Sequence, residues 1–366
     1  MSTPIHISPL TGGADEEATG HFDRVSTLTH LLENYEAPAA PVIARPDYRE
    51  LNTVARAQFD ERRRAHLIDG IVVKTPQLAT LLKEVKRASL RADKPVGRTG
   101  VVLSGPPTAG KTTGAFHVMV EGMRRHALRY PDWKQLGHTP VVYAEVPPNC
   151  TAKSMMGRFL EALELPFVHR MTLEERTQLA VQHLVRARTT LIVVDEMQNL
   201  ARDSKGHSEA LQALKGMFNA VRATPLYVGI NLESRLLTGD GLGAQFASRS
   251  AVVTLGKLGI DDDAEQRVWR SVILAFEKQL GLLNQPLESL PQLADYLWTR
   301  TRGSISALSR LLTDAALDLV EAGEPDNEVI TKELLESIRL DLTSELELER
   351  ANEIGLHTQK GRRRAA

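Results

Sequence analysis

The residues best suited to chemistry lie in the segment SGPPTAGKTT, at positions 104–113. Gly105, Gly110, Lys111 and Thr112 match the phosphate-binding pattern G-x-x-x-x-G-K-[ST]. The glycines let backbone N–H groups turn inward around anionic oxygens, and the helix that follows presents its positive end to them. We therefore expect Lys111 to reach the β- and γ-phosphates of ATP, and the Thr112 hydroxyl to bind Mg²⁺.

Two acidic residues, Asp195 and Glu196, follow the apolar run at 191–194. Asp195 is expected to hold Mg²⁺ through water, and Glu196 to orient and activate the attacking water, so that ATP is hydrolysed. Such a pair alone could be a solvated turn, but the upstream phosphate-binding pattern favours a site. The predicted nucleotide-binding residues are Gly105, Pro106, Pro107, Thr108, Ala109, Gly110, Lys111, Thr112, Thr113 and Asp195.

Two further polar residues are predicted to complete catalysis. Asn231 ends the run PLYVGIN and is expected to contact the γ-phosphate and the attacking water; the alternative is a turn residue at a strand end. Arg249 follows a glycine-rich loop and is expected to act as an arginine finger on the γ-phosphate of a neighbouring subunit. The alternative for Arg249 is a structural or solvated arginine, and Arg235 is a weaker candidate for the finger.

These residues need a scaffold that places strand ends together. Continuous apolar runs are typical of strands buried on both faces of a parallel sheet, and amphipathic segments between them predict covering helices. The predicted strands are 100–104, 140–146, 190–195, 225–230 and 251–255, and the helices between them are 112–130, 151–164, 172–188 and 208–221. Further helices are expected at 24–35, 47–64 and from Thr75, and again after residue 260.

The fold class predicted is α/β, with a parallel five-stranded sheet flanked by helices, an N-terminal helical extension and a small C-terminal helical lid. The expected divisions are a leader and extension at 1–64, the nucleotide-binding domain at 65–258, the lid at 259–345 and a basic tail at 346–366.

Composition narrows the class of protein. The 366 residues include 45 basic and 46 acidic side chains, so any nucleic-acid contact must be a local basic patch. The single cysteine, Cys150, excludes an internal disulfide and fits a reducing compartment. Neither a secretory signal nor an apolar run of membrane-spanning length is evident, so we expect a cytoplasmic protein. The scattered histidines do not predict a metal site built of protein ligands.

The order of these motifs resembles AAA+ P-loop ATPases, and within them it is most similar to the TniB/TnsC transposition ATPases. The resemblance is carried by LSGPPTAGKTT, AEVPPNCTAKSMMGRFLEALELPF, VVDEMQNL and TRGSISALSRLLTDAA, and it covers roughly residues 65 to 340. It implies strand order 5-1-4-3-2, a helical lid, and ATP-dependent homo-oligomers, rings or filaments, on double-stranded DNA. It also implies contact with a DDE transposase and sometimes with a target-site selector.

The sequence departs from this family pattern at two points. Many lids carry an arginine three residues after the glycine that is Gly303 here, but Ser306 stands at that position, so Arg302 or Arg310 would have to substitute. Gln198 stands where relatives often carry histidine.

Binding to DNA requires Lys and Arg side chains that face phosphates. The candidates are Lys153, Arg158, Lys83 and Lys86, followed by Arg62, Arg63, Arg64, Arg87, Lys205 and the basic tail. The alternative for each of them taken singly is a solvated surface charge, and the set is more suggestive than its members. Because no base-reading motif is evident, largely non-specific binding is expected. Two other functions remain open: a helicase loader of the DnaC/IstB kind, and a signalling or defence scaffold switched by ATP.

Overall fold

The computed structural model describes residues 22–36, 39–94, 99–200, 204–233 and 249–340. The chain divides into two compact units. The described part of the α/β unit lies within 22–35 and 77–255, and that of the helical unit lies within 36–76 and 256–340.

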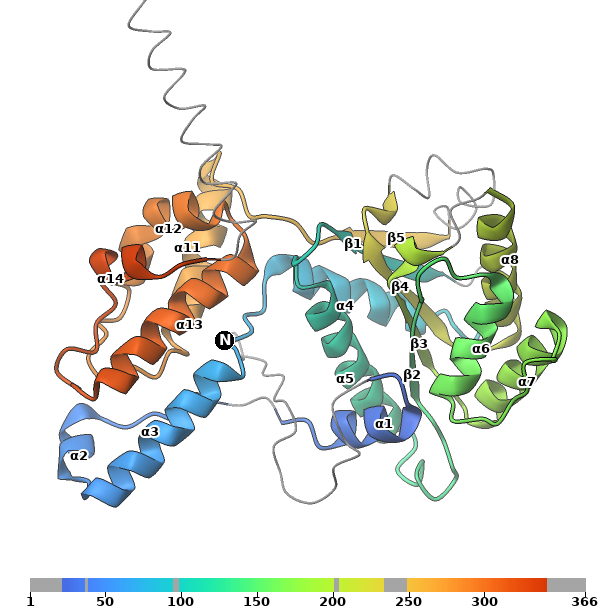
Figure 1. Ribbon diagram of the computed structural model, residues 1–366, viewed down its shortest axis with the longest axis horizontal. Coiled ribbons are helices and arrows are strands. Elements are labelled where there is room, and N and C mark those ends of the chain that lie inside the picture. Colours follow the sequence, from blue (N-terminus) through green and yellow to red (C-terminus); the bar gives the residue numbers. More distant parts are fainter. Residues whose placement is uncertain (1–21, 37–38, 95–98, 201–203, 234–248, 341–366) are drawn as a thin grey trace, which may run out of the picture. The chain divides into compact units, whose positions relative to one another are not determined.

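A single parallel sheet forms the centre of the α/β unit (Figure 1). Its order is β2-β3-β4-β1-β5, which is the order implied by the resemblance, read from the other edge. Every pair of neighbouring strands is parallel. The predicted fold class is confirmed. The strands are β1 (Gly100–Gly105), β2 (Val141–Glu145), β3 (Leu191–Asp195), β4 (Thr224–Ile230) and β5 (Ser250–Thr254).

Helices cover both faces of this sheet, which is why its central strands are continuously apolar. In Figure 1, α4 and α5 lie on one side of the strands, and α6, α7 and α8 lie on the other. Side chains from α6, α7 and α8 join those of β2, β3 and β4 in one buried core. The α-helices that the structure describes in this unit are α1 (Val25–Glu33), α4 (Pro76–Ser89), α5 (Lys111–Arg129), α6 (Ala152–Ala162), α7 (Leu173–Arg186) and α8 (Ser204–Ala220).

The helical unit has its own core, centred on the fully buried Trp269 and Phe276. The helix expected at 47–64 is instead two helices, because the Asn52 side chain accepts from Ala55 N at 2.9 Å and starts a new one. The second of these, α3, packs against α13. The helices are α2 (Arg45–Glu50), α3 (Thr53–Ile68), α11 (Asp263–Glu277), α12 (Ala294–Thr301), α13 (Ile305–Ala322) and α14 (Lys332–Ser337).

Strand register brings the carboxyl ends of three strands together. Gly105, at the end of β1, pairs with Ile230, at the end of β4, and Val194 of β3 pairs with Tyr227 of the same β4. In parallel α/β sheets, this edge is where loops converge to form ligand sites. The predicted phosphate loop and the predicted acidic pair both leave the sheet here.

Candidate nucleotide site

The segment between β1 and α5 has the geometry of a phosphate-binding loop. A Cβ atom on Gly105 would overlap the carbonyl oxygen of Leu255, so only glycine fits there. Gly110 has φ 78°, a left-handed conformation that favours glycine, and it is the N-cap of α5. No side chain caps α5 at Gly110, so the N–H groups of its first turn remain available for an anion.

Lys111, the first residue of α5, folds back across the loop. Its Nζ donates to the carbonyl oxygen of Pro106 at 2.7 Å. Burial lowers the pKa of Lys111, while the negative charges of Glu196 and Asp195 act in the opposite direction. Both carboxylates thus favour the charged form of the ammonium group. Thr112 beside it is exposed.

Asp195, the last residue of β3, is a buried carboxylate with hydrogen bonds to both oxygens. Tyr143 of β2 donates its hydroxyl to Oδ2 at 3.0 Å, and the backbone N–H of Glu196 donates to Oδ1 at 2.7 Å. Desolvation raises the pKa of Asp195, and these two bonds partly offset that rise. A carboxylate and the Thr112 hydroxyl at one edge are oxygen donors of the kind that suits Mg²⁺.

Tyr143 is a site residue that the sequence reasoning missed. The sequence gives little indication of this role, because Tyr143 lies in the apolar strand VVYAE and only its hydroxyl distinguishes it from a core residue. The register of β2 against β3 places Tyr143 opposite Val193, two residues before Asp195. Its importance therefore depends on strand pairing, which the local sequence does not specify.

Glu196 lies just beyond the sheet in a left-handed conformation, with φ 57°. Burial raises its pKa first, and the negative charges of Asp195 and Glu145 raise it further. The amide nitrogen of Gln198 donates to Glu196 Oε2. A non-glycine residue in the left-handed region costs free energy, and such conformations cluster at functional sites.

Asn231 and Arg249 lie at opposite edges of the sheet. Asn231 directly follows β4 and is exposed, with φ 49°, and Ile230 before it pairs with Gly105. Arg249 precedes β5, and its carbonyl oxygen accepts from Gly100 N at 3.1 Å, at the amino end of β1. The structure thus brings Lys111, Asp195, Glu196 and Asn231 to one edge and leaves Arg249 at the other. Arg235 lies outside the described residues.

The basic residues considered for DNA differ in their surroundings. Lys83, Lys86 and Lys153 are exposed. Arg158 is intermediate in exposure. It forms an ion pair with Glu161 at 2.6 Å and a longer one with Asp23 at 3.9 Å. The side chain of Lys205 and the basic tail lie outside what the structure describes.

Arg63 is not available to DNA, contrary to the sequence-based expectation. Its side chain is 1% exposed, and it forms ion pairs with Glu328 at 2.7 Å and Asp60 at 2.5 Å. Of its neighbours in the arginine run, Arg62 is exposed and Arg64 pairs with Glu61 at 2.7 Å.

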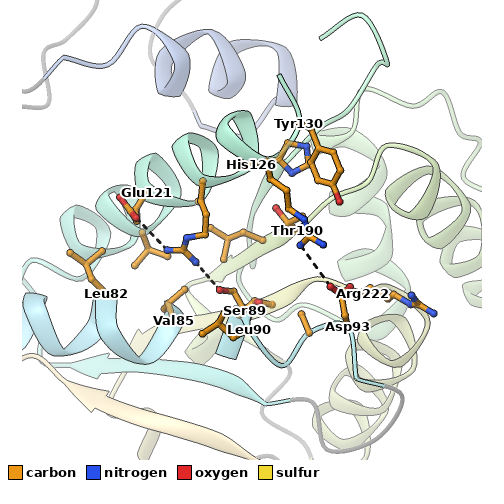
Figure 2. A pocket seen from close by; sticks show the side chains of 17 residues that line it. Leu82, Val85, Ser89, Leu90, Asp93, Glu121, His126, Tyr130, Thr190 and Arg222 are labelled. Atoms are coloured by element: carbon orange, nitrogen blue, oxygen red, sulfur yellow. Dashed lines mark hydrogen bonds and ion pairs between the residues drawn. The ribbon is translucent and has the colours of Figure 1, made fainter. Parts of the chain in front are cut away.

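A separate cavity of about 130 Å³ lies between α4, α5 and the amino ends of β3 and β4 (Figure 2). Leu191 and Thr224, the first residues of those strands, line it, and Arg125 on its wall donates to Ser89 Oγ at 2.7 Å. It opens at the edge of the sheet opposite the phosphate loop, so it is not part of the nucleotide site.

None of the helices in the described residues has the length and apolar character needed to cross a membrane. Within the same ranges, His, Cys, Asp and Glu side chains do not gather in groups of three or more suited to a metal ion.

Comparison with known families settles the affiliation of the chain. The model of the family described as bacterial TniB protein matches residues 63–259, which is more than half of the chain. The chain belongs to the TniB family. This family is the one that the sequence resemblance implied. No curated protein sequence matches it.

Solved structures similar to this TniB protein share little sequence with it. Cdc6p from Pyrobaculum aerophilum is 17% identical, with TM-score 0.46 and coverage of 72% of this chain and 71% of that one. ORC1 from Aeropyrum pernix, solved with DNA, is 18% identical, with TM-score 0.48 and coverage of 75% and 65%. A RuvB variant from Thermotoga maritima is 15% identical, with TM-score 0.42 and coverage of 70% and 65%. The chain thus spans about two thirds of the length of these structures.

Proposed function

We propose that this TniB protein binds ATP with Mg²⁺ at the loop 105–113 and hydrolyses it as part of an oligomer on duplex DNA. The observation that carries the proposal is that Lys111, Asp195 and Glu196 all lie at the carboxyl ends of β1 and β3, two strands joined through β4. Lys111 would leave the Pro106 carbonyl for the β- and γ-phosphates.

Thr112 and, through water, Asp195 would hold Mg²⁺, which when bound neutralises charge on the phosphate oxygens. Glu196 would orient the attacking water and accept its proton. Asn231 would contact the γ-phosphate, since it leaves β4 beside the end of β1.

Arg249 would serve the site of a neighbouring subunit rather than its own. It lies beside Gly100, and the phosphate loop begins at Gly105. Five residue steps of strand span roughly 17 Å, a distance that exceeds the reach of an arginine side chain. A finger at this edge can therefore act only across a subunit interface.

Hydrolysis is tested by phosphate release from the wild type, Lys111→Ala and Glu196→Gln, with binding of a non-hydrolysable ATP analogue measured by calorimetry. Glu196→Gln is expected to retain binding and lose turnover by roughly 100-fold or more, whereas Lys111→Ala is expected to lose binding. Lys134→Ala, an exposed lysine on the surface turn after α5, is the control and should change neither. Turnover by Glu196→Gln at the wild-type rate would remove Glu196 from the mechanism.

The intersubunit role of Arg249 is tested by mixing two inactive variants. Arg249→Ala keeps an intact phosphate loop, and Lys111→Ala keeps an intact finger. Mixed oligomers should therefore regain part of the ATPase activity that each variant lacks alone. Absence of recovery in oligomers shown to contain both variants would refute a finger supplied by a neighbour.

The DNA and transposase parts of the proposal rest on TniB family membership and on the exposed lysines. Lys83, Lys86 and Lys153 would face the phosphates, while Arg158 would first have to leave Glu161. Binding to duplex DNA should require nucleotide, vary little with sequence and weaken steeply with salt. Replacing the three lysines by alanine should reduce the salt slope. Salt-insensitive binding would exclude this interface.

Recruitment of a transposase is the most specific part of the proposal. It predicts that a DDE transposase joins DNA-bound oligomers formed with the ATP analogue and is released when ATP is hydrolysed. Co-sedimentation of the transposase with and without duplex DNA measures this directly. Transposase binding that depends on neither nucleotide nor DNA would refute this recruitment step.

A further inference from the structure

Gln198 connects two parts of the proposed site that are separate in sequence. It lies one residue beyond Met197 in the short helical turn that follows the acidic pair (Met197–Asn199). Its amide nitrogen donates to Glu196 Oε2, and its amide oxygen accepts from Ile230 N at 2.9 Å. Ile230 ends β4 and precedes Asn231. One side chain thus links the acidic residue to the strand that carries the proposed γ-phosphate contact.

The two partners of Gln198 fix the orientation of its amide. A carboxylate can only accept, and a backbone N–H can only donate. A flipped amide would therefore place oxygen against oxygen and N–H against N–H, and both bonds would be lost. Glutamine meets both demands at once, whereas a carboxylate at this position would meet only the demand of Ile230.

The neighbouring backbone is built to admit this side chain. A Cβ atom on Gly229 would lie 2.6 Å from the amide oxygen of Gln198, well inside contact distance, so any other residue there would displace the glutamine. Gly229 has no left-handed φ that would otherwise explain the glycine. Its lack of a side chain therefore matters for the approach of Gln198 to β4.

We propose that Gln198 is a positioning residue that holds the Glu196 carboxylate for attack by water and couples it to the Asn231 segment. This inference rests on the proposed function of Glu196. With Oε2 anchored, Oε1 of Glu196 has no hydrogen-bond partner within the described part of the chain and can take the water. A shift of β4 on contact with the γ-phosphate would be passed to Glu196 through one amide.

The test compares Gln198→Ala, Gln198→Glu and Gly229→Ala with the wild type. Gln198→Glu keeps the size and the acceptor for Ile230 but loses the donor to Glu196. All three variants should lower kcat by about tenfold or more, because misplacing a catalytic group by about 1 Å costs up to roughly 100-fold. KM and affinity for the ATP analogue should stay within about twofold, since the hydrogen bonds of Gln198 to Glu196 and Ile230 lie outside the phosphate loop.

Two controls separate positioning from general damage. Gln178→Ala removes another glutamine–glutamate bond, from Gln178 to Glu174 on the exposed side of α7, and should leave kcat unchanged. The second control is the double variant Gln198→Ala/Asn231→Ala, whose kcat should fall less than the product of the two single losses, because the two residues act through one path.

The outcomes distinguish the two proposals. If Glu196→Gln turns over like the wild type, the proposed role of Glu196 fails. If Glu196→Gln loses turnover while Gln198→Ala and Gln198→Glu keep wild-type kcat, Glu196 stands and the positioning role of Gln198 is refuted. Equal falls in kcat and in analogue affinity would also refute it, because that pattern would indicate collapse of the whole site.

Discussion

The buried ion pair between Arg63 and Glu328 offers a quantitative test of the helical unit. Both side chains are 1% exposed, and the guanidinium group makes two bonds to the carboxylate, at 2.7 and 3.0 Å. Glu328 Oε2 also accepts from Leu283 N at 2.7 Å. The pair therefore ties α3 to the segment before α14, over 265 residues of sequence.

Glu328→Gln removes the negative charge at nearly constant volume and leaves the Arg63 charge buried. Removing one member of a buried pair costs about 3–5 kcal/mol. Asp60 remains 2.5 Å from the guanidinium and compensates in part, so we expect the lower end, about 3 kcal/mol of unfolding free energy. Replacing both partners by apolar residues, as in Arg63→Met/Glu328→Leu, should cost less than Glu328→Gln alone, because it leaves no fully buried charge. Asp60, which then loses its ion pair, is 15% exposed and keeps the hydrogen bond from Tyr48 at 2.7 Å.

The assay is urea unfolding followed by tryptophan fluorescence, because Trp269 and Trp298 both lie in this unit. The control is Glu61→Gln on the same helix, which breaks the Arg64–Glu61 pair at 2.7 Å while Glu61 is 70% exposed. Exposed pairs contribute at most about 1 kcal/mol. A Glu328→Gln variant as stable as Glu61→Gln would show that burial does not set the strength of this pair.

Three further predictions concern the α/β unit. Gly105→Ala should lower the unfolding free energy measured in urea by several kcal/mol, because its Cβ would overlap the Leu255 carbonyl oxygen. Gly110→Ala has open space and should cost only about 1–2 kcal/mol of left-handed strain. Equal losses in the two variants would contradict the structure. Tyr143→Phe should lower the unfolding free energy by about 1.5–3 kcal/mol, because a buried carboxylate loses its donor; an unchanged urea midpoint would contradict this. Burial, aided by the nearby Arg124 charge, lowers the pKa of His117 from 6.5 to about 4. Because the fold favours neutral His117, the stability that this residue contributes is fully present above pH 6.5. It is lost as pH falls toward 4, where the unfolding free energy should be lower by up to roughly 3 kcal/mol. His117→Leu should flatten this part of the plot of unfolding free energy against pH.

Much of the α/β unit could be predicted from sequence because its signals are local. Each predicted strand falls within one residue of an observed one at both ends, since each is a strand-length apolar run. The expectation that every strand is buried on both faces holds for β1 to β4 but not for β5, in which only Val253 is buried. The phosphate loop is recognised from the spacing of Gly105, Gly110 and Lys111, because backbone geometry requires the two glycines and phosphate binding requires the lysine charge. The roles of Asp195, Glu196, Asn231 and Arg249 stay predictions until the variants above are measured.

Other features depend on contacts between distant segments, which local sequence does not encode. Three consecutive arginines, 62 to 64, look equivalent in the sequence, yet only Arg63 is buried, because helix periodicity turns it toward Glu328. Tyr143 meets Asp195 only because β2 pairs with β3. Gln198 reaches Ile230 only because β3 lies beside β4 and Gly229 leaves room. The sequence by itself determined the strands, the loop and the identity of the reactive groups, since those follow from residue type and spacing. The tertiary structure alone decided which charges are buried and which side chains hold the reactive groups, because burial and hydrogen bonding are properties of neighbours in space.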